Sequence, residues 1–497
     1  MDFSFLSRSE KRKKADALVL PFWKGEKKGI CASGLSVDFI PFLSAALETG
    51  DFKGKEGEVL CLYLQDQPEK RIVLLGLGDE QTISTESFRR SFGSLTKTCI
   101  SRKWKSINLI VPETAIISTN SLSLGVAEGI LLPNYSIAQF KSSDDEDSEL
   151  PGLLEKVTWV GLHKSGIAIA EKTLKICEAV YYARDLVNGN ADEVTPQFLE
   201  ACARGLEKEF PKVKATLFNK KRIEKEKLDL LLAVNRGSAL DPAFIILEYK
   251  GNPKAKQNIV IVGKAVTYDT GGLNIKTSGM ETMKCDMGGG AVCFGVMLAI
   301  ASLGLKANVT VVIPATENSV DAKSFKPGDV YTGYLGKSVE MTNSDAEGRL
   351  ILADALAYAV ENLNPTYLID FATLTGAVEI ILGSEATGLM STDDKLAVHL
   401  MEAGERTSER LWRLPLYEEY KEKLKSDIAD MKSWNGRSAS SSVAATFLKE
   451  FTGNIPWAHC DIASTAYLSE AKKYLPKYAT GVGIRMMVDF IEHVFHV

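Results

Sequence analysis

Short apolar runs of strand type alternate with helical segments along most of this chain. In the first third these runs are 17–22, 59–64, 72–77, 107–111 and 157–162, and a long helix is expected over 168–187. Such alternation is typical of helices packed on the faces of a sheet. We therefore predict an α/β fold that begins with a small α/β domain.

A second and larger α/β unit follows. Its strand candidates are 230–234, 244–249, 258–263, 309–313 and 367–370, with helical spacers between many of them. Protein domains usually contain roughly 100–200 residues, so we expect two or three domains in this chain of 497 residues. We place an N-terminal domain at 1–163, a linking helix at 164–190, and a C-terminal domain with a central mixed sheet at 191–497.

The bulk composition argues against several function classes. The formal net charge of −5 disfavours a protein that binds nucleic acid mainly by electrostatics. No apolar run reaches the ~20 residues of a membrane helix, and the N-terminus does not resemble a secretory signal. We expect a cytoplasmic protein whose eight scattered cysteines are reduced and mostly buried. The acidic run 142–149 is expected to be a solvated loop.

Four carboxylates fall in glycine-bearing loops after strands of the larger domain: Asp269, Asp286, Asp345 and Glu347. Ligands of open α/β sheets bind beyond the carboxyl ends of strands, so we expect these loops to converge. Converging like charges repel one another, and two divalent cations ~3.5–4 Å apart would neutralise them. The sequence therefore indicates a two-metal site.

The segment 343–350 reads Asn-Ser-Asp-Ala-Glu-Gly-Arg-Leu and precedes a helix expected over 350–360. If its backbone is extended, Asp345, Glu347 and Arg349 lie on one side of it. Such a charged rim before a helix is a place where metals and anions gather.

Two lysines lie near these carboxylates in the sequence, Lys264 and Lys276. A deprotonated lysine can serve as a metal ligand, and a charged one can polarise a carbonyl. The glycine run 288–290 at the start of a helix could instead cradle a phosphate. It matches neither the P-loop nor the dinucleotide-binding pattern.

These segments resemble the cytosolic leucyl aminopeptidases, the M17 family of two-metal exopeptidases. The resemblance rests on the octapeptide 343–350, on 262–289, and on further matches at 372–377, 457–463 and 479–481. It spans residues 165–490, whereas the preceding residues match only in general character, that of a macro-like α/β domain. Peptide substrates and a homohexamer are implied for the whole protein.

The resemblance implies which residues hold two divalent cations, Mn²⁺ or Zn²⁺. Lys264, Asp269, Asp286 and Glu347 would bind the tighter ion. Asp269, Asp345 and Glu347 would bind the more exchangeable one, so that Asp269 and Glu347 bridge the two.

The resemblance also implies catalytic and pocket residues. Lys276 would stay protonated and stabilise the gem-diolate formed at the scissile carbonyl, and Arg349 would hold a bicarbonate ion as general base. The free α-amine of the peptide would bind a metal, so that only N-terminal residues, preferably leucine, are removed. An apolar pocket for their side chains would be lined by Met283, Thr373, Gly376 and Ala463.

The chain departs from the family pattern at two places near the site. Ser344 stands where threonine is common, which keeps the hydroxyl group. The stretch between Lys276 and Asp286 is one residue shorter than is typical, which would shift the loop carrying Lys276. His459 lies in a matched segment and is interpreted as structural.

Two alternatives remain at the level of sequence. One is an additional DNA-binding or regulatory role, for which the candidate basic residues are Arg8, Lys11, Arg12, Lys13, Lys14, Lys220, Lys221 and Arg222. The other is a different two-metal hydrolase such as a phosphoesterase, which the lysine ligand and the presence of only five histidines disfavour.

Overall fold

The computed structural model describes residues 1–7, 11–26, 40–63, 69–137 and 152–496. The chain divides into two compact units, Met1–Cys177 with Glu470–Pro476, and Glu178–Ser469 with Lys477–Val497. Each unit is built on its own sheet with helices, which confirms the predicted two-domain α/β architecture. The acidic run 142–149 and Arg8 lie outside the described residues.

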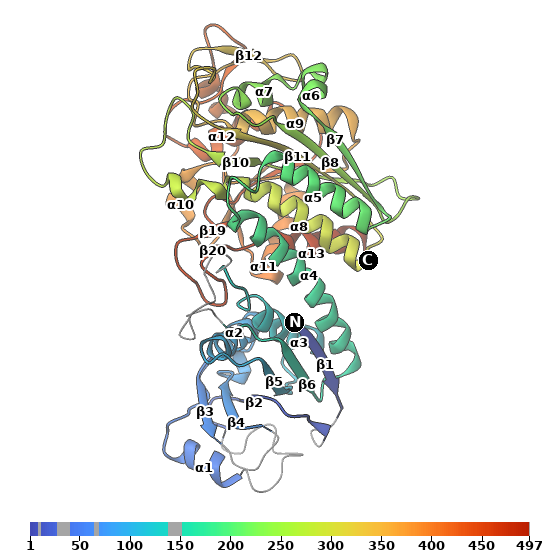
Figure 1. Ribbon diagram of the computed structural model, residues 1–497, viewed down its shortest axis with the longest axis vertical. Coiled ribbons are helices and arrows are strands. Elements are labelled where there is room, and N and C mark those ends of the chain that lie inside the picture. The colour runs from blue at the N-terminus through green and yellow to red at the C-terminus, as the bar shows by residue number, and fades with distance from the viewer. Residues whose placement is uncertain (8–10, 27–39, 64–68, 138–151, 497) are drawn as a thin grey trace. The chain divides into compact units, whose positions relative to one another are not determined.

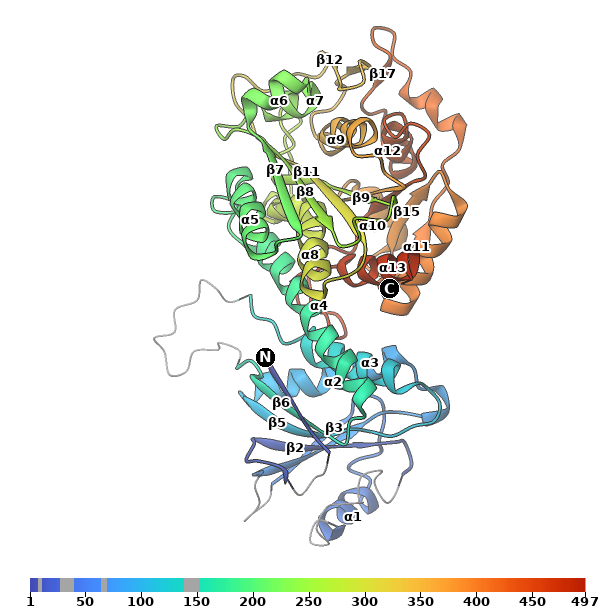
Figure 2. The same cartoon turned by 90° about the vertical axis from the view of Figure 1, so that its right-hand side faces the viewer.

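The first unit contains a six-stranded sheet with the order β1-β6-β5-β2-β4-β3. Neighbouring strands are parallel except for β3, which pairs antiparallel with β4. Helices α2 and α3 cover one face and α1 lies on the other, where Leu43 and Ala46 join a core with Leu18 and Leu20 (Figures 1 and 2). The elements are β1 (Asp2–Leu6), β2 (Ala17–Phe22), α1 (Ile40–Glu48), β3 (Val59–Tyr63), β4 (Arg71–Gly76), η3 (Glu80–Thr82), α2 (Thr85–Ser101), β5 (Ser106–Ile110), α3 (Thr119–Leu131), β6 (Lys156–Val160) and α4 (Lys164–Asn188), within which the division falls.

Local sequence explains these elements. Every residue of β2 is buried, as a continuous apolar run in an inner parallel strand should be. Helices α2 and α3 each begin after a serine, Ser84 and Ser118, whose side chain accepts a backbone N–H of the first turn. The apolar runs predicted between residues 17 and 162 therefore form β2 to β6, whereas β1 has no counterpart among the predicted strands.

The second unit contains a nine-stranded sheet with the order β16-β15-β18-β14-β9-β11-β8-β7, in which β10 also pairs with β11. The central pairs β18–β14, β14–β9 and β9–β11 are parallel, while β8 and β15 pair antiparallel with β11 and β18. The predicted mixed sheet is thus confirmed. Helices α5, α8 and α13 lie on one face and α7, α9 and α12 on the other (Figures 1 and 2).

The second unit's helices are α5 (Pro196–Glu209), α6 (Lys220–Glu226), α7 (Asp229–Asn235), η4 (Met280–Met287), α8 (Gly288–Leu303), α9 (Gly348–Asn362), α10 (Gly376–Leu382), α11 (Asp394–Thr407), η5 (Glu418–Leu424), α12 (Ser440–Lys449) and α13 (Ile484–Phe495). Its strands are β7 (Val213–Phe218), β8 (Ala243–Lys250), β9 (Ile259–Gly263), β10 (Ala265–Asp269), β11 (Asn308–Asn318), β12 (Val330–Thr332), β13 (Ser338–Glu340), β14 (Tyr367–Ala372), β15 (Thr387–Ser391), β16 (Leu411–Arg413), β17 (Met431–Lys432), β18 (Trp457–Asp461), β19 (Tyr467–Leu468) and β20 (Tyr478–Ala479).

The strand predicted over 230–234 is wrong, because this segment forms α7. A short apolar run has the same pattern in a buried strand and in a buried helix. The helix is selected by Asp354 on α9, whose carboxylate accepts the backbone N–H groups of Leu230 and Leu231 at 2.9 and 3.1 Å. A carboxylate at this end satisfies N–H groups that have no partner inside the helix.

The helical segment Met280–Leu303, formed by η4 and α8, is long and apolar enough to cross a membrane, although no such run was expected from the sequence. Of its most apolar window, 78% is buried inside the structure. Helix α8 packs against β9, β11, β14 and α13, which are the contacts of a core helix.

Candidate metal centre

Four segments of the second unit bring the predicted carboxylates and lysines together, and two of these segments lie at the carboxyl ends of strands. Lys264 follows β9, Asp269 ends β10, Asp286 lies in η4, and Glu347 immediately precedes α9. These four side chains are buried, with no more than 5% of any residue exposed. The loops therefore converge as the strand-end argument predicts.

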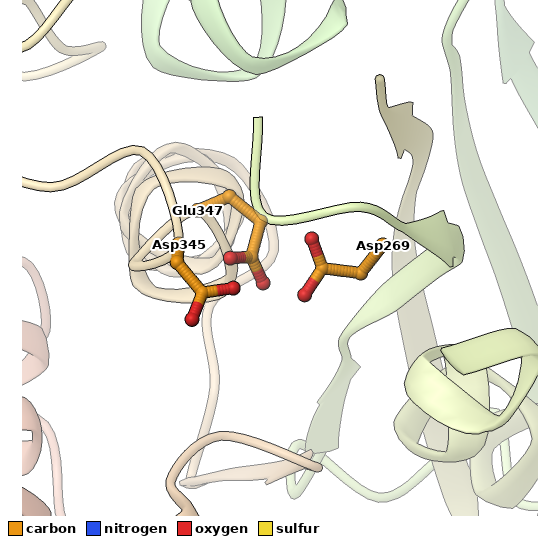
Figure 3. A group of neighbouring side chains, drawn as sticks. All are labelled: Asp269, Asp345 and Glu347. Atoms are coloured by element: carbon orange, nitrogen blue, oxygen red, sulfur yellow. The ribbon is translucent and has the colours of Figure 1, made fainter. Parts of the chain in front are cut away.

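Asp269, Asp345 and Glu347 form the heart of the site. Each offers a carboxylate oxygen, and these oxygens lie within 4.8 Å of one another. Figure 3 shows the carboxylate of Glu347 turned toward that of Asp269, with Asp345 beside it. Asp345 is the exposed member of the three. Carboxylate oxygens grouped in this way suit a hard divalent cation.

The backbone that carries Asp345 and Glu347 is not an extended rim. Asp345 lies in a turn, Glu347 has helical dihedral angles, and α9 begins at Gly348, two residues before the predicted start. Asp345 and Glu347 still reach the same place, whereas Arg349 is carried into the first turn of the helix. Asp345 and Glu347 therefore precede the helix, whereas Arg349 is part of it.

The Lys264 ammonium group lies between Asp286 and Glu347. Its Nζ is 2.7 Å from Asp286 Oδ1 and 2.8 Å from Glu347 Oε1, and it donates to the carbonyl oxygen of Thr373 at 2.9 Å. Burial lowers the pKa of Lys264, but the nearby carboxylates outweigh burial and the pKa is raised. Lys264 is charged in this arrangement and would have to lose a proton to become a metal ligand.

Lys276 reaches the other side of the cluster. Its Nζ is 2.8 Å from Asp269 Oδ2 and 2.5 Å from Asp345 Oδ1. Burial lowers the pKa of Lys276, yet the attraction of Asp269 and Glu347 is stronger and the pKa is raised. The shorter loop before Asp286 therefore does not remove Lys276 from the site, and its amine is charged at neutral pH.

Burial and mutual repulsion perturb the carboxylates. Burial, followed by the charge of Glu347, raises the pKa of Asp269 to about 6, and burial raises the pKa values of Asp286 and Asp345 as well. Burial also acts to raise the pKa of Glu347, but Lys264 and Lys276 outweigh it and that pKa is lowered. The cluster holds more negative charge than its two lysines neutralise, which is the condition that favours cation binding.

The residues present fit a bound divalent cation. Asp286 Oδ2 and Glu347 Oε2 are buried oxygens that have no hydrogen-bond partner among the described residues. A buried acceptor without a partner is destabilising, and a bound cation would supply the partner. The donor set of four carboxylates and one amine is the set that the sequence predicts.

Two glycines make room for Lys264. A Cβ atom on Gly348 would lie 2.6 Å from Cε and 2.7 Å from Nζ of Lys264. A Cβ atom on Gly289 would lie 2.0 Å from the carbonyl oxygen of Phe371, because α8 passes close to β9 and β14. The glycines at 289 and 290 are therefore explained by the close packing of α8 against neighbouring segments.

Arg349 is the second residue of α9 and is 4% exposed. It donates from Nη1 to the carbonyl oxygen of Ser433 at 2.8 Å, while its buried Nε has no hydrogen-bond partner among the described residues. Burial lowers the pKa of Arg349 to about 10, so the guanidinium is still charged at neutral pH. An unused N–H on a charged group near a helix start is suited to an anion.

The four predicted pocket residues come from three segments. Thr373 donates from Oγ1 to Asp286 Oδ1 at 2.7 Å, which ties it to the carboxylate cluster. The turn before Gly376 and the turn holding Ala463 are joined through Asp461, which accepts the backbone N–H groups of Thr375 and Ala463 at 3.4 and 3.3 Å. Met283 lies in η4, three residues before Asp286, and is partly buried.

His459 lies apart from the carboxylate cluster. It is fully buried on β18, its Nδ1 is 2.5 Å from Asp370 Oδ1, and Asp370 Oδ2 also accepts the indole N–H of Trp457 at 2.8 Å. Burial lowers the pKa of His459, but Asp370 outweighs burial and the pKa is raised. This pairing agrees with the structural interpretation of His459.

Sequence reasoning missed three polar residues that support the site. Asn318, at the end of β11, donates to Asp269, Asn274 is hydrogen-bonded to Ser344, and Asp461 joins the two pocket turns. Asn318 carries one signal that could have been used, since it is a carboxamide at the carboxyl end of a buried apolar strand.

Comparison with known proteins gives matches over both units of the chain. Residues 181–488 match the catalytic domain of the cytosol aminopeptidase family, and residues 19–144 match the N-terminal domain of the same family. The chain is 61% identical to a "Probable cytosol aminopeptidase" of Protochlamydia amoebophila over 99% of both chains. It is 47% identical to a protein of the same name from Chlamydia felis over 97% of both chains.

Solved structures lead to the same family. A mutant of tomato leucine aminopeptidase superimposes with a TM-score of 0.87 at 29% identity, covering 99% of this chain and 96% of that one. The bottromycin maturation enzyme BotP in complex with Mn superimposes with a TM-score of 0.84 at 28% identity, covering 97% and 99%. The family models match both domains and the relatives match over nearly their full length, so the chain belongs to the cytosol aminopeptidase family.

Proposed function

We propose that this member of the family is a metal-dependent aminopeptidase of the leucyl type, which removes N-terminal residues from peptides with the help of two divalent cations. The observation that carries the proposal is the group of oxygens from Asp269, Asp345 and Glu347 within 4.8 Å of one another, joined to Asp286 through Lys264. Manganese or zinc is the proposed metal, and the manganese complex of BotP is consistent with the former.

The proposed ligands follow from the arrangement. Lys264, Asp269, Asp286 and Glu347 would hold one ion, and Asp269, Asp345 and Glu347 the other. Two such ions supply a nucleophilic water at neutral pH and polarise the scissile carbonyl group. The exposed position of Asp345 supports its assignment to the more exchangeable ion.

Lys276 and Arg349 would assist without holding metal. Lys276 keeps its proton because Asp269 and Glu347 outweigh its burial, so it can donate a hydrogen bond to the negative charge that develops on the carbonyl oxygen. Arg349 has a buried Nε without a partner among the described residues, and this N–H would hold an anion such as bicarbonate that accepts the proton of the attacking water.

The preference for leucine would come from an apolar pocket beside Asp286. Thr373 is anchored to Asp286, and a Cβ atom on Gly288 would lie 3.4–3.7 Å from Thr373, Ile462 and Ala466. Met283, which lies in η4 with Asp286, would add a flexible side chain that suits several apolar partners. Gly376 and Ala463 would complete the wall.

The proposal is tested by metal content and turnover in one protein preparation. The wild type should bind two Mn²⁺ or Zn²⁺ ions per chain and cleave leucine anilides. Asp345→Ala should lose about one ion per chain and fall by at least ~100-fold in kcat/KM, because ligand loss removes Lewis-acid activation. Asp427→Ala, which alters an exposed carboxylate of the same unit, should match the wild type. A folded, metal-loaded wild type without turnover would refute the proposal.

The structure pairs three of the basic candidates for an additional DNA-binding role with acidic residues. Of the basic candidates, Arg12 pairs with Glu69 at 2.8 Å, Lys220 with Asp241 at 3.2 Å, and Arg222 with Glu226 at 3.5 Å. These acids reduce the positive charge that a phosphate backbone would meet. A cytoplasmic homohexamer is proposed from the family alone, and size-exclusion chromatography with light scattering would test it.

A further inference from the structure

We propose that Asn318 is a positioning residue, which holds the two halves of the carboxylate cluster at a fixed separation before any metal binds. This inference rests on the proposed two-metal function and deepens it. One half is Asp269 at the end of β10, and the other is the turn that leads from Ser344 to Glu347.

The Asn318 carboxamide connects these halves directly. Its Nδ2 donates to Asp269 Oδ1 at 2.8 Å and to the carbonyl oxygen of Ser344 at 3.0 Å. Asn318 also lies opposite Asp269 in the pairing of β10 with β11, and its carbonyl oxygen accepts Thr270 N at 2.9 Å. The amide therefore stands on a rigid strand and reaches both halves at once.

The chemistry of the position selects an amide. Both neighbours are acceptors, so the group that faces them must supply two N–H donors, as a carboxamide does and an ionised carboxylate does not. The Oδ1 atom of Asn318 is buried and has no hydrogen-bond partner among the described residues. An apolar residue would avoid that unsatisfied oxygen but would leave Asp269 Oδ1 and the carbonyl oxygen of Ser344 without this donor, so the position favours the two donated hydrogen bonds.

Ser344 gives the same two segments a second connection. Its hydroxyl group donates to the carbonyl oxygen of Gly271 at 2.7 Å and accepts the backbone N–H of Asn274 at 2.7 Å. The backbone N–H of Ser344 donates to Asn274 Oδ1 at 2.9 Å, and Ser344 is fully buried. We call the hydrogen bonds of Asn318 and Ser344 the clamp.

The clamp acts on metal binding through Asp269. Gly271 N and Asn318 Nδ2 both donate to Asp269 Oδ1 at 2.8 Å, which fixes the orientation of the carboxylate. Partners of this kind orient metal ligands, and their loss typically lowers metal affinity by about 10–100-fold. Without Asn318, Asp269 and the turn at Ser344 can move apart, and binding must first restore their separation.

The test compares two buried asparagines, Asn318 at the end of β11 and Asn235, which is hydrogen-bonded to the same strand. Asn235 is 3% exposed and donates from Nδ2 to the carbonyl oxygen of Leu240 and to Thr316 on β11 at 2.8 and 3.2 Å, but it does not contact the cluster. Asn318→Leu and Asn235→Leu both remove two hydrogen bonds from the same unit. Metal-free full-length proteins are titrated with Mn²⁺ by calorimetry, with thermal unfolding and leucine-anilide turnover measured on the same samples.

Asn318→Leu should bind Mn²⁺ about 10–100-fold more weakly than the wild type. Excess Mn²⁺ should restore much of its turnover. Asn235→Leu should lose stability but keep the wild-type Mn²⁺ affinity, and it should show no rescue by excess metal. A folded Asn318→Leu protein with wild-type Mn²⁺ affinity would overturn the inference.

Two further outcomes are decisive. If Asn318→Leu does not fold, Ser344→Ala tests the clamp from its other side: weaker Mn²⁺ binding supports the inference, and wild-type binding overturns it. If the wild type itself neither binds Mn²⁺ nor cleaves leucine anilides, the proposed function and this inference both fail. If the wild type does both and the variants match it, only the inference fails.

Discussion

Replacing Lys264 by methionine should strongly destabilise the metal-free protein. The Lys264 ammonium group is the cation shared by Asp286 and Glu347, at 2.7 and 2.8 Å, and all three side chains are nearly inaccessible to solvent. Removing one partner of a buried ion pair leaves an uncompensated charge and costs about 3–5 kcal/mol. Methionine has a similar length and shape, so lost packing adds little to this cost.

The assay is urea unfolding in the presence of EDTA, followed by a probe in the second unit. Lys250→Met is the matched control, because Lys250 ends β8 and its ion pair with Glu248, 3.6 Å long, leaves 66% of the lysine side chain exposed. An exposed pair contributes about 0–1 kcal/mol. If Lys264→Met lowers the free energy of unfolding by no more than Lys250→Met does, our account of the buried cluster is refuted.

Two further predictions concern α9, the helix that contains Gly348 and Asp354. Gly348→Ala should destabilise the fold by about 1–3 kcal/mol, because the added methyl group overlaps Lys264. The control is Gly205→Ala in α5, where a Cβ atom meets nothing within 4 Å. This variant should stabilise the protein by up to ~1 kcal/mol in the same unfolding assay. Burial raises the pKa of Asp354 from 3.8 to about 7 in spite of backbone N–H donors such as Tyr334, so the folded protein binds this proton more tightly than the unfolded chain. The resulting stability is present at low pH and is lost as the pH rises from about 4 to about 7, so the wild type should exceed Asp354→Asn by more at pH 5 than at pH 7.5. An equal or reversed difference would contradict that sign.

The sequence predicted the structure best where a residue pattern is compatible with only one kind of structure. The apolar runs that became β8, β11 and β14 each follow a helix or a helical spacer, and strands that alternate with helices fit an α/β sheet. The carboxylates and lysines could be placed together because strand ends in such a sheet share an edge. The family resemblance over 262–289 and 343–350 then implied which of these residues hold metal and which assist.

The remaining features depend on contacts between distant residues. The helix formed by 230–234 is stabilised by Asp354, which lies more than a hundred residues later in the chain. The clamp could not be predicted from spacing either, since Asn318 and Asp269 are 49 residues apart and meet only when β10 pairs with β11. The structure also shows Lys276 bound to Asp345, which loop length alone could not predict.

The two lysines of the cluster have a consequence for the order of events in the life of the protein. Four carboxylates and two ammonium groups sum to a formal charge of −2 (−4 + 2), with each lysine bound to two of the acids. The chain thus carries internal counter-ions, and we expect the metal-free polypeptide to reach its native structure unaided. In small zinc domains, by contrast, metal binding and folding are one event. Here the finished protein would take up its ions afterwards, so the metal available in the cell at that time, and not during synthesis, would decide which ion it carries.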